Sequence, residues 1–156
     1  MPKAITLREI DERRFEKPRY HVLLHGQVVE TLEWNLRGYT GTLPTADGLD
    51  FHVGEKPLSS YRSAAAVLNR EWAGVEQWYE VQSTSNYRQG VKVCGKELQK
   101  ALEYAGRVQA YEEGRGNLAG HWHAAVVEVT LRGQRRRERD VKVFCGSSST
   151  YQARAA

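Results

Sequence analysis

The sequence predicts an α+β fold, in which a mostly antiparallel sheet is built from hairpins, two main helices pack against it, and a long C-terminal β-hairpin carries a basic tip. Short alternating runs of β-branched and aromatic residues, separated by turn residues, are typical of antiparallel hairpins. Apolar residues at clear helical spacing occur in two segments. The length of 156 residues fits one domain with its own core. We therefore expect residues 1–146 to form a single α+β domain and residues 147–156 to be a frayed tail.

The first third of the chain predicts a hairpin after an ambiguous start. Thr6-Leu7-Arg8-Glu9 has the form of a capping box, which would begin a short helix ending near Glu16, but the same residues also alternate as a strand. Residues 20–25 and 28–36 flank Gly26-Gln27, which suits a type II′ turn. Glycines and prolines then interrupt the pattern until a short strand at about 49–53.

Two segments have the periodicity of amphipathic helices. In residues 59–72 the apolar positions form one stripe, with Ser59 or Ser60 as the expected N-cap and Gly74 as the stop. Residues 96–112 carry a second apolar stripe. Between the helices, strands are expected at 77–84 and 87–93. Residues 114–120 are expected to form a loop.

The C-terminal hairpin holds the excess of positive charge. Residues 121–131 and 141–145 alternate, so that each arm has one apolar face. The connecting segment, residues 132–142, contains six basic and two acidic residues, a net charge of +4 that equals the net charge of the whole chain. The basic residues, expected in a solvated tip, are Arg132, Arg135, Arg136, Arg137, Arg139 and Lys142.

An arginine-rich tip on a two-stranded ribbon predicts nucleic-acid binding. A ribbon fits a groove, and guanidinium groups pair with phosphates or guanine edges. We therefore expect these six residues to bind DNA or RNA in a small, non-catalytic or accessory protein. The alternative is a protein-interaction module, an inhibitor or regulator, whose hairpin docks on an acidic protein partner. A solvated tip also implies that replacing residues 135–137 together leaves stability nearly unchanged.

Aromatic residues in or beside the predicted strands suggest a further contact with nucleic acid. Exposed rings can stack on bases, although burial in the core is the more common role of such rings. These residues are Trp34, Tyr39, Trp78, Tyr79, Tyr87 and Trp122.

The sequence contains no catalytic signature, so we expect neither an enzyme nor a cofactor. Residues 114–119 match a dinucleotide-binding fingerprint, but they follow a predicted helix and precede a strand, which is the reverse of the required order. His121 and His123 would lie on one side of a strand, and a zinc site needs further ligands. We expect no metal at this pair.

The cysteine and apolar content predicts a cytoplasmic protein. Cys94 and Cys145 form no C-x-x-C pair, which is typical of a reducing compartment. No apolar run exceeds five residues, and the first eight residues lack an apolar signal core. We therefore expect no membrane partner.

Overall fold

The structure is a computed structural model that describes residues 3–10, 17–116 and 120–146. Within these residues it contains two helices and ten strands with antiparallel pairing, so the predicted α+β fold is confirmed. The chain divides into two compact units, Met1–Val75 and Glu76–Ala156. That residues 1–146 form one domain stays a prediction. The tail at 147–156 lies outside the described residues.

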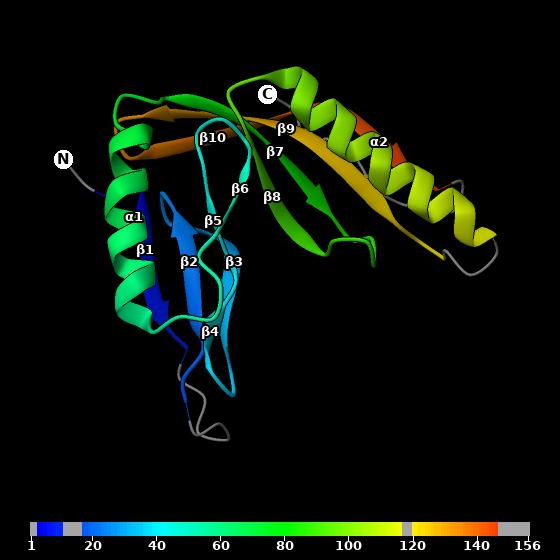
Figure 1. The fold of residues 1–156 in the computed structure, drawn as a ribbon. Helices are drawn as coiled ribbons and strands as arrows, with labels where there is room; N and C mark the ends of the chain where they lie inside the picture. Colours follow the sequence, from blue (N-terminus) through cyan, green and yellow to red (C-terminus); the bar gives the residue numbers. More distant parts are fainter. Residues whose placement is uncertain (1–2, 11–16, 117–119, 147–156) are drawn as a thin grey trace. The chain divides into compact units, whose positions relative to one another are not determined.

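Within its described residues, the first unit contains a four-stranded antiparallel sheet, a two-stranded sheet and one helix (Figure 1). The four-stranded sheet has the order β1-β2-β3-β4, and β5 pairs with β6. The strands are β1 (Ile5–Glu9), β2 (Tyr20–Leu24), β3 (Gln27–Asn35), β4 (Gly38–Thr40), β5 (Thr42–Pro44) and β6 (Asp50–His52). The short strand expected at about 49–53 is therefore confirmed.

Two features at the start of the chain resolve or correct the sequence predictions. Residues 5–9 form a strand and not a capping-box helix, because β2 supplies backbone partners and Ile5 is buried. The β2–β3 turn consists of His25-Gly26, with φ values of 47° and 84°, so it has the positive angles of a type I′ turn. The predicted type II′ turn at Gly26-Gln27 is wrong, because Gln27 already pairs with Leu24.

Helix α1 (Leu58–Trp72) confirms the first predicted helix. Its buried residues are Tyr61, Ala65, Leu68 and Trp72, which belong to the predicted stripe. The helix stops before Gly74, whose φ of +80° suits glycine. Pro57 occupies the N-cap position without a side-chain hydrogen bond, so the predicted caps Ser59 and Ser60 lie inside the helix. Asn69 of α1 joins the helix to β1, because its amide accepts from the N–H of Ile5 and donates to the Ile5 carbonyl.

The second unit contains a four-stranded antiparallel sheet with the order β10-β9-β7-β8 and helix α2. Its elements are β7 (Gln77–Ser83), β8 (Gly90–Gly95), α2 (Leu98–Arg115), β9 (His123–Arg132) and β10 (Arg135–Cys145). The predicted hairpin is present, but its second strand begins at Gly90 and not at residue 87, so residues 84–89 form the β7–β8 loop. Helix α2 continues into the segment predicted as a loop, and ends where Gly116, with a φ of 55°, donates its N–H to the Glu113 carbonyl.

Helix α2 packs on one face of this sheet. Ala101, Ala105 and Val108 form a buried cluster with sheet residues that include Val81 and Val126. The small alanine side chains allow close contact between helix and sheet. Figure 1 shows α2 beside the half of β9 that lies away from the β9–β10 turn. Among the described residues, neither helix is long and apolar enough to cross a membrane.

Candidate nucleic-acid interface on strand β10

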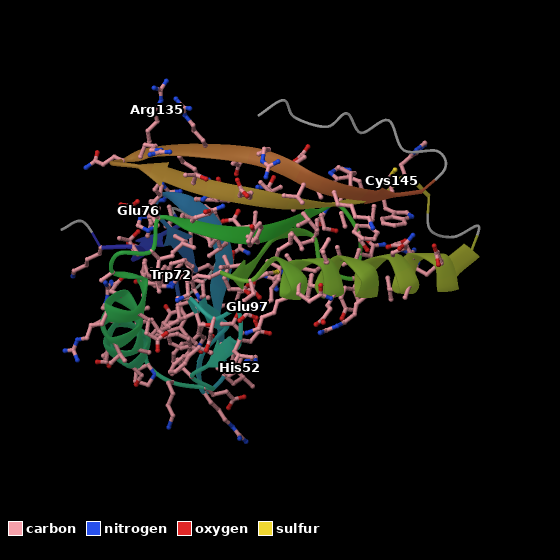
Figure 2. All side chains as sticks on the ribbon, turned by 90° about the horizontal axis from the view of Figure 1, so that it is seen from above. His52, Trp72, Glu76, Glu97, Arg135 and Cys145 are labelled. Atoms are coloured by element: carbon pink, nitrogen blue, oxygen red, sulfur yellow. The ribbon has the colours of Figure 1, made fainter. Side chains whose placement is uncertain are left out.

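The β9–β10 hairpin is present, and the structure corrects where its basic residues lie. The turn is only Gly133-Gln134, since Arg135 already pairs with Arg132. Gly133 has a φ of 65°, which permits a tight reversal of the chain. Most of the cations therefore lie along an 11-residue strand and not in a solvated loop. Figure 2 shows Arg135 at the turn end of β10 and Cys145 at its other end.

The alternation of the strand sorts the charges of β10 onto two faces. Arg135, Arg137 and Arg139 are exposed, whereas the intervening Arg136 and Glu138 are half-buried. A register shift follows Asp140, after which exposed Lys142 pairs with Val126, on the same side as the arginines. The exposed cations on this side of the hairpin, here called the basic face, are Arg132, Arg135, Arg137, Arg139 and Lys142.

The basic face belongs to the side of the sheet on which α2 packs, but it extends past the helix. Val126 is part of the buried cluster with α2. From its partner Lys142 the cations continue toward the turn, where β9 presents Glu128, Thr130 and Arg132 on the same side. The sheet therefore presents an exposed row of positive charge between α2 and the turn.

Two arrangements of charge in this row favour the binding of an anion. Arg139 donates to Glu128 at 3.1 Å, with the arginine side chain half exposed. Exposed pairs of this kind contribute little stability, so Arg139 can exchange its carboxylate for another anion. Arg132 and Arg135 lie directly opposite each other. Like charges in this position are destabilising, and a bound anion would remove that repulsion.

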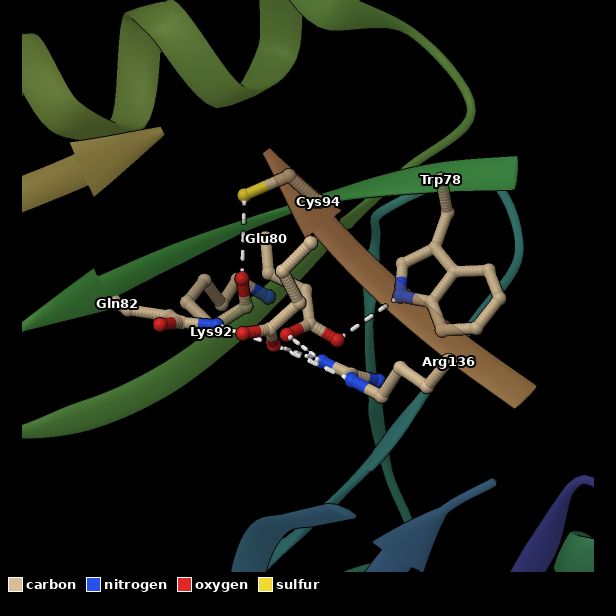
Figure 3. Close-up of polar contacts among 7 residues, drawn as sticks. Trp78, Glu80, Gln82, Lys92, Cys94 and Arg136 are labelled. Carbon is tan, nitrogen blue, oxygen red and sulfur yellow. Dashed lines mark hydrogen bonds and ion pairs between the residues drawn. The ribbon is translucent and has the colours of Figure 1, made fainter. Parts of the chain in front are cut away.

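Arg136 lies on the opposite face and has a structural role. Its Nη2 contacts Glu80 Oε1 at 2.6 Å and Glu138 Oε1 at 2.9 Å, and the guanidinium lies 5.7 Å from the Trp78 ring centroid. Glu80 is fully buried and also accepts from Trp78 Nε1 at 2.9 Å (Figure 3). Gln82 completes the cluster by donating to Glu138. Arg136 is therefore not a member of the basic face.

This cluster corrects the expectation that residues 135–137 are one solvated group. The alternation of cations and acids from Arg137 to Asp140 was visible in the sequence and could have indicated a strand with two different faces. The partner of Arg136 could not have been found in the same way, because Glu80 is 56 residues away.

The two cysteines differ in their surroundings. Cys94 is 2% exposed, and its thiol lies 3.5 Å from the Lys92 carbonyl oxygen. Burial raises the pKa of the Cys94 thiol to about 11, so the thiolate that a nucleophilic cysteine requires is scarce near neutral pH. Cys145 is exposed at the end of β10, and neither cysteine forms a disulfide.

The other predicted candidates are dispersed. Tyr39, Trp78 and Trp122 are core residues, whereas Trp34 and Tyr87 are exposed. Tyr79 is half-buried on β7.

His123 begins β9, where its N–H donates to the Thr84 hydroxyl, and His121 precedes that strand. The described part of the chain holds no group of three or more His, Cys, Asp or Glu residues arranged for a metal. The absence of a metal in solution stays a prediction.

No family model, curated protein or solved structure matches the chain, so only its own geometry points to a function.

Proposed function

We propose that this protein binds nucleic acid, without catalysing a reaction on it, through the basic face of the β9–β10 hairpin. One observation carries the proposal. Strand alternation gathers five cations on one exposed side with a single carboxylate, Glu128, while the two acids of β10 lie on the other side with Arg136. Binding to phosphates would release the counterions condensed on the nucleic acid, which is the main source of affinity for such surfaces.

The spacing of the row supports a polyanion as the ligand. Arg135, Arg137 and Arg139 occupy alternate positions of one strand, so their Cα atoms follow each other at about 7 Å. Guanidinium groups bind phosphate oxygens through two parallel hydrogen bonds. A straight series of such groups suits the regularly repeated phosphates of DNA or RNA.

An acidic protein partner is the alternative, and the position of β10 gives it some support. β10 is the outer strand of its sheet, and outer strands can accept a further strand from a partner. Arginine and lysine on an outer strand, however, commonly prevent such pairing. We therefore rank nucleic acid above an acidic protein as the proposed partner. The cytoplasmic location stays a prediction from the sequence.

A charge-matched pair of variants tests the proposal. Arg135→Glu with Arg137→Glu changes the basic face, and Arg62→Glu with Arg70→Glu changes two exposed positions of α1. Each pair lowers the net charge from +4 to zero. We expect the first pair to weaken binding of a labelled oligonucleotide by about 100-fold or more at low salt, and the second by less than about threefold, because short-range phosphate contacts dominate affinity.

Fluorescence anisotropy with single-stranded DNA, duplex DNA and RNA of equal length measures these affinities. Equal losses in the two variants would mean that net charge and not the basic face attracts the ligand. Absence of binding by the parent protein to all three probes at low salt would contradict the proposal. The arginines would then serve to prevent pairing of the outer strand β10 with another strand, or to bind an acidic protein.

A further inference from the structure

Cations and tyrosines alternate along one side of helix α2. Lys100, Tyr104, Arg107, Tyr111 and Arg115 are separated by four, three, four and four residues, which places them in one stripe of an α-helix. This stripe runs beside the buried side of the helix. Arg107 is exposed, and the Tyr111 side chain is 41% exposed. Arg107 and Tyr111 of the stripe therefore lie at the surface, whereas Tyr104 is half-buried against the core cluster.

A third tyrosine reaches the same surface from the β7–β8 loop. The ring centroid of Tyr87 lies 5.4 Å from that of Tyr111 and 6.0 Å from that of Tyr104. Tyr87 is 42% exposed. The Arg115 guanidinium lies 5.8 Å from the centroid of Tyr111. Tyr87, Tyr104 and Tyr111, here called the tyrosine patch, thus form a continuous aromatic surface that adjoins cations.

A buried carboxylate holds the loop in this position. Glu112 of α2 is 1% exposed and accepts from the Ser85 hydroxyl at 2.5 Å. The Ser85 oxygen in turn accepts from the N–H of Tyr87 at 3.1 Å, and Arg115 contacts the same carboxylate at 3.3 Å. The backbone of Tyr87 is therefore held relative to α2, which lowers the entropy that the loop loses when a ligand binds to the ring.

We propose that the tyrosine patch stacks on the unpaired bases of a single-stranded nucleic acid. The inference rests on the proposed function and specifies its ligand. Every base offers a flat π-face, and aromatic side chains that adjoin cations are the usual contact surface for single strands. Bases inside a duplex are stacked on each other and do not present these faces. Lys100 and Arg107 add positive charge to the stripe, which favours a phosphate backbone over an apolar protein segment as the occupant.

The test uses two probes of equal length, an oligothymidine and an abasic oligonucleotide that has the same phosphates without bases. Tyr87→Leu with Tyr111→Leu removes the aromatic faces but keeps apolar side chains, and Tyr87→Phe with Tyr111→Phe keeps the faces. We expect the parent protein and the phenylalanine variant to bind oligothymidine at least about tenfold more tightly than the abasic probe. The leucine variant should lose most of this preference while binding the abasic probe normally.

The controls separate this inference from the proposed function. Arg135→Glu with Arg137→Glu should weaken binding of both probes, because both carry phosphates. If the leucine variant binds oligothymidine as tightly as the parent, or if the parent binds both probes equally, the stacking inference is wrong and phosphate binding stands. If the parent binds neither probe but binds duplex DNA, the stacking inference is wrong and the proposed function stands; if it binds neither probe, nor duplex DNA, nor RNA, the proposed function fails as well. The single variants Tyr87→Leu and Tyr111→Leu serve the same test if the double variant does not fold.

Discussion

Replacing Arg136 with methionine is expected to lower the free energy of unfolding by about 3–5 kcal/mol, because the change leaves a buried carboxylate without its cation. Glu80 is fully buried, and its Oε1 forms an ion pair of 2.6 Å with Nη2 of Arg136. The hydrogen bond from Trp78 remains in the variant, but a single neutral donor does not replace a positive charge. Methionine keeps much of the length and apolar contact of the arginine side chain, so the loss reports the charge. Urea unfolding followed by circular dichroism measures it.

Arg137→Met is the matched control, since this neighbouring side chain is exposed on the other face of the same strand. We expect it to change the free energy of unfolding by no more than about 0.5 kcal/mol. The double variant Glu80→Gln with Arg136→Met removes both charges and should be more stable than Arg136→Met alone, because the buried charge is gone. Equal effects of Arg136→Met and Arg137→Met would contradict the structural role of Arg136.

Leu68→Ala is expected to lower the free energy of unfolding by about 2–5 kcal/mol, because it removes buried methyl groups and leaves a cavity under α1. Leu68 is 2% exposed and lies on the buried side of α1 together with Tyr61 and Trp72. The size of the loss within this range depends on how far the surrounding side chains can fill the space.

Val67 gives the matched control on the same helix, because its side chain is 54% exposed. Val67→Ala should change the free energy of unfolding by no more than about 0.5 kcal/mol, since little apolar surface is lost and alanine favours a helix. A loss below about 0.5 kcal/mol for Leu68→Ala would mean that α1 is not packed through this side.

The elements that could be predicted from the sequence are those in which local spacing and tertiary burial agree. The buried residues of α1 recur at helical spacing and Gly74 follows the last turn, so both the helix and its end were predictable. The helix start was not, because serine is a common N-cap and the sequence does not show that Pro57 takes that position.

The placement of β10 was less predictable, because its charges are satisfied by distant residues. A run of arginines is usually a solvated loop, whereas here β10 pairs along its length with β9 and the half-buried Arg136 is neutralised by Glu80 on β7. The α2 stripe of alternating tyrosines and cations was predictable from helical spacing alone. The contact of Tyr87 with this stripe was not, because it depends on the hydrogen bond between Ser85 and Glu112 across 27 residues.

The salt dependence of oligonucleotide binding tests the role of the basic face most directly. If its five cations each neutralise one phosphate, a plot of log K against log salt concentration should have a slope of about −4.5 on duplex DNA and about −3.5 on a single strand. Arg135→Ala with Arg137→Ala removes two contacts and should make the slope shallower by about 1.8 on the duplex or 1.4 on the single strand, without a loss of thermal stability. A parent slope shallower than about −1, or a slope that the two replacements leave unchanged, would contradict phosphate binding by this face.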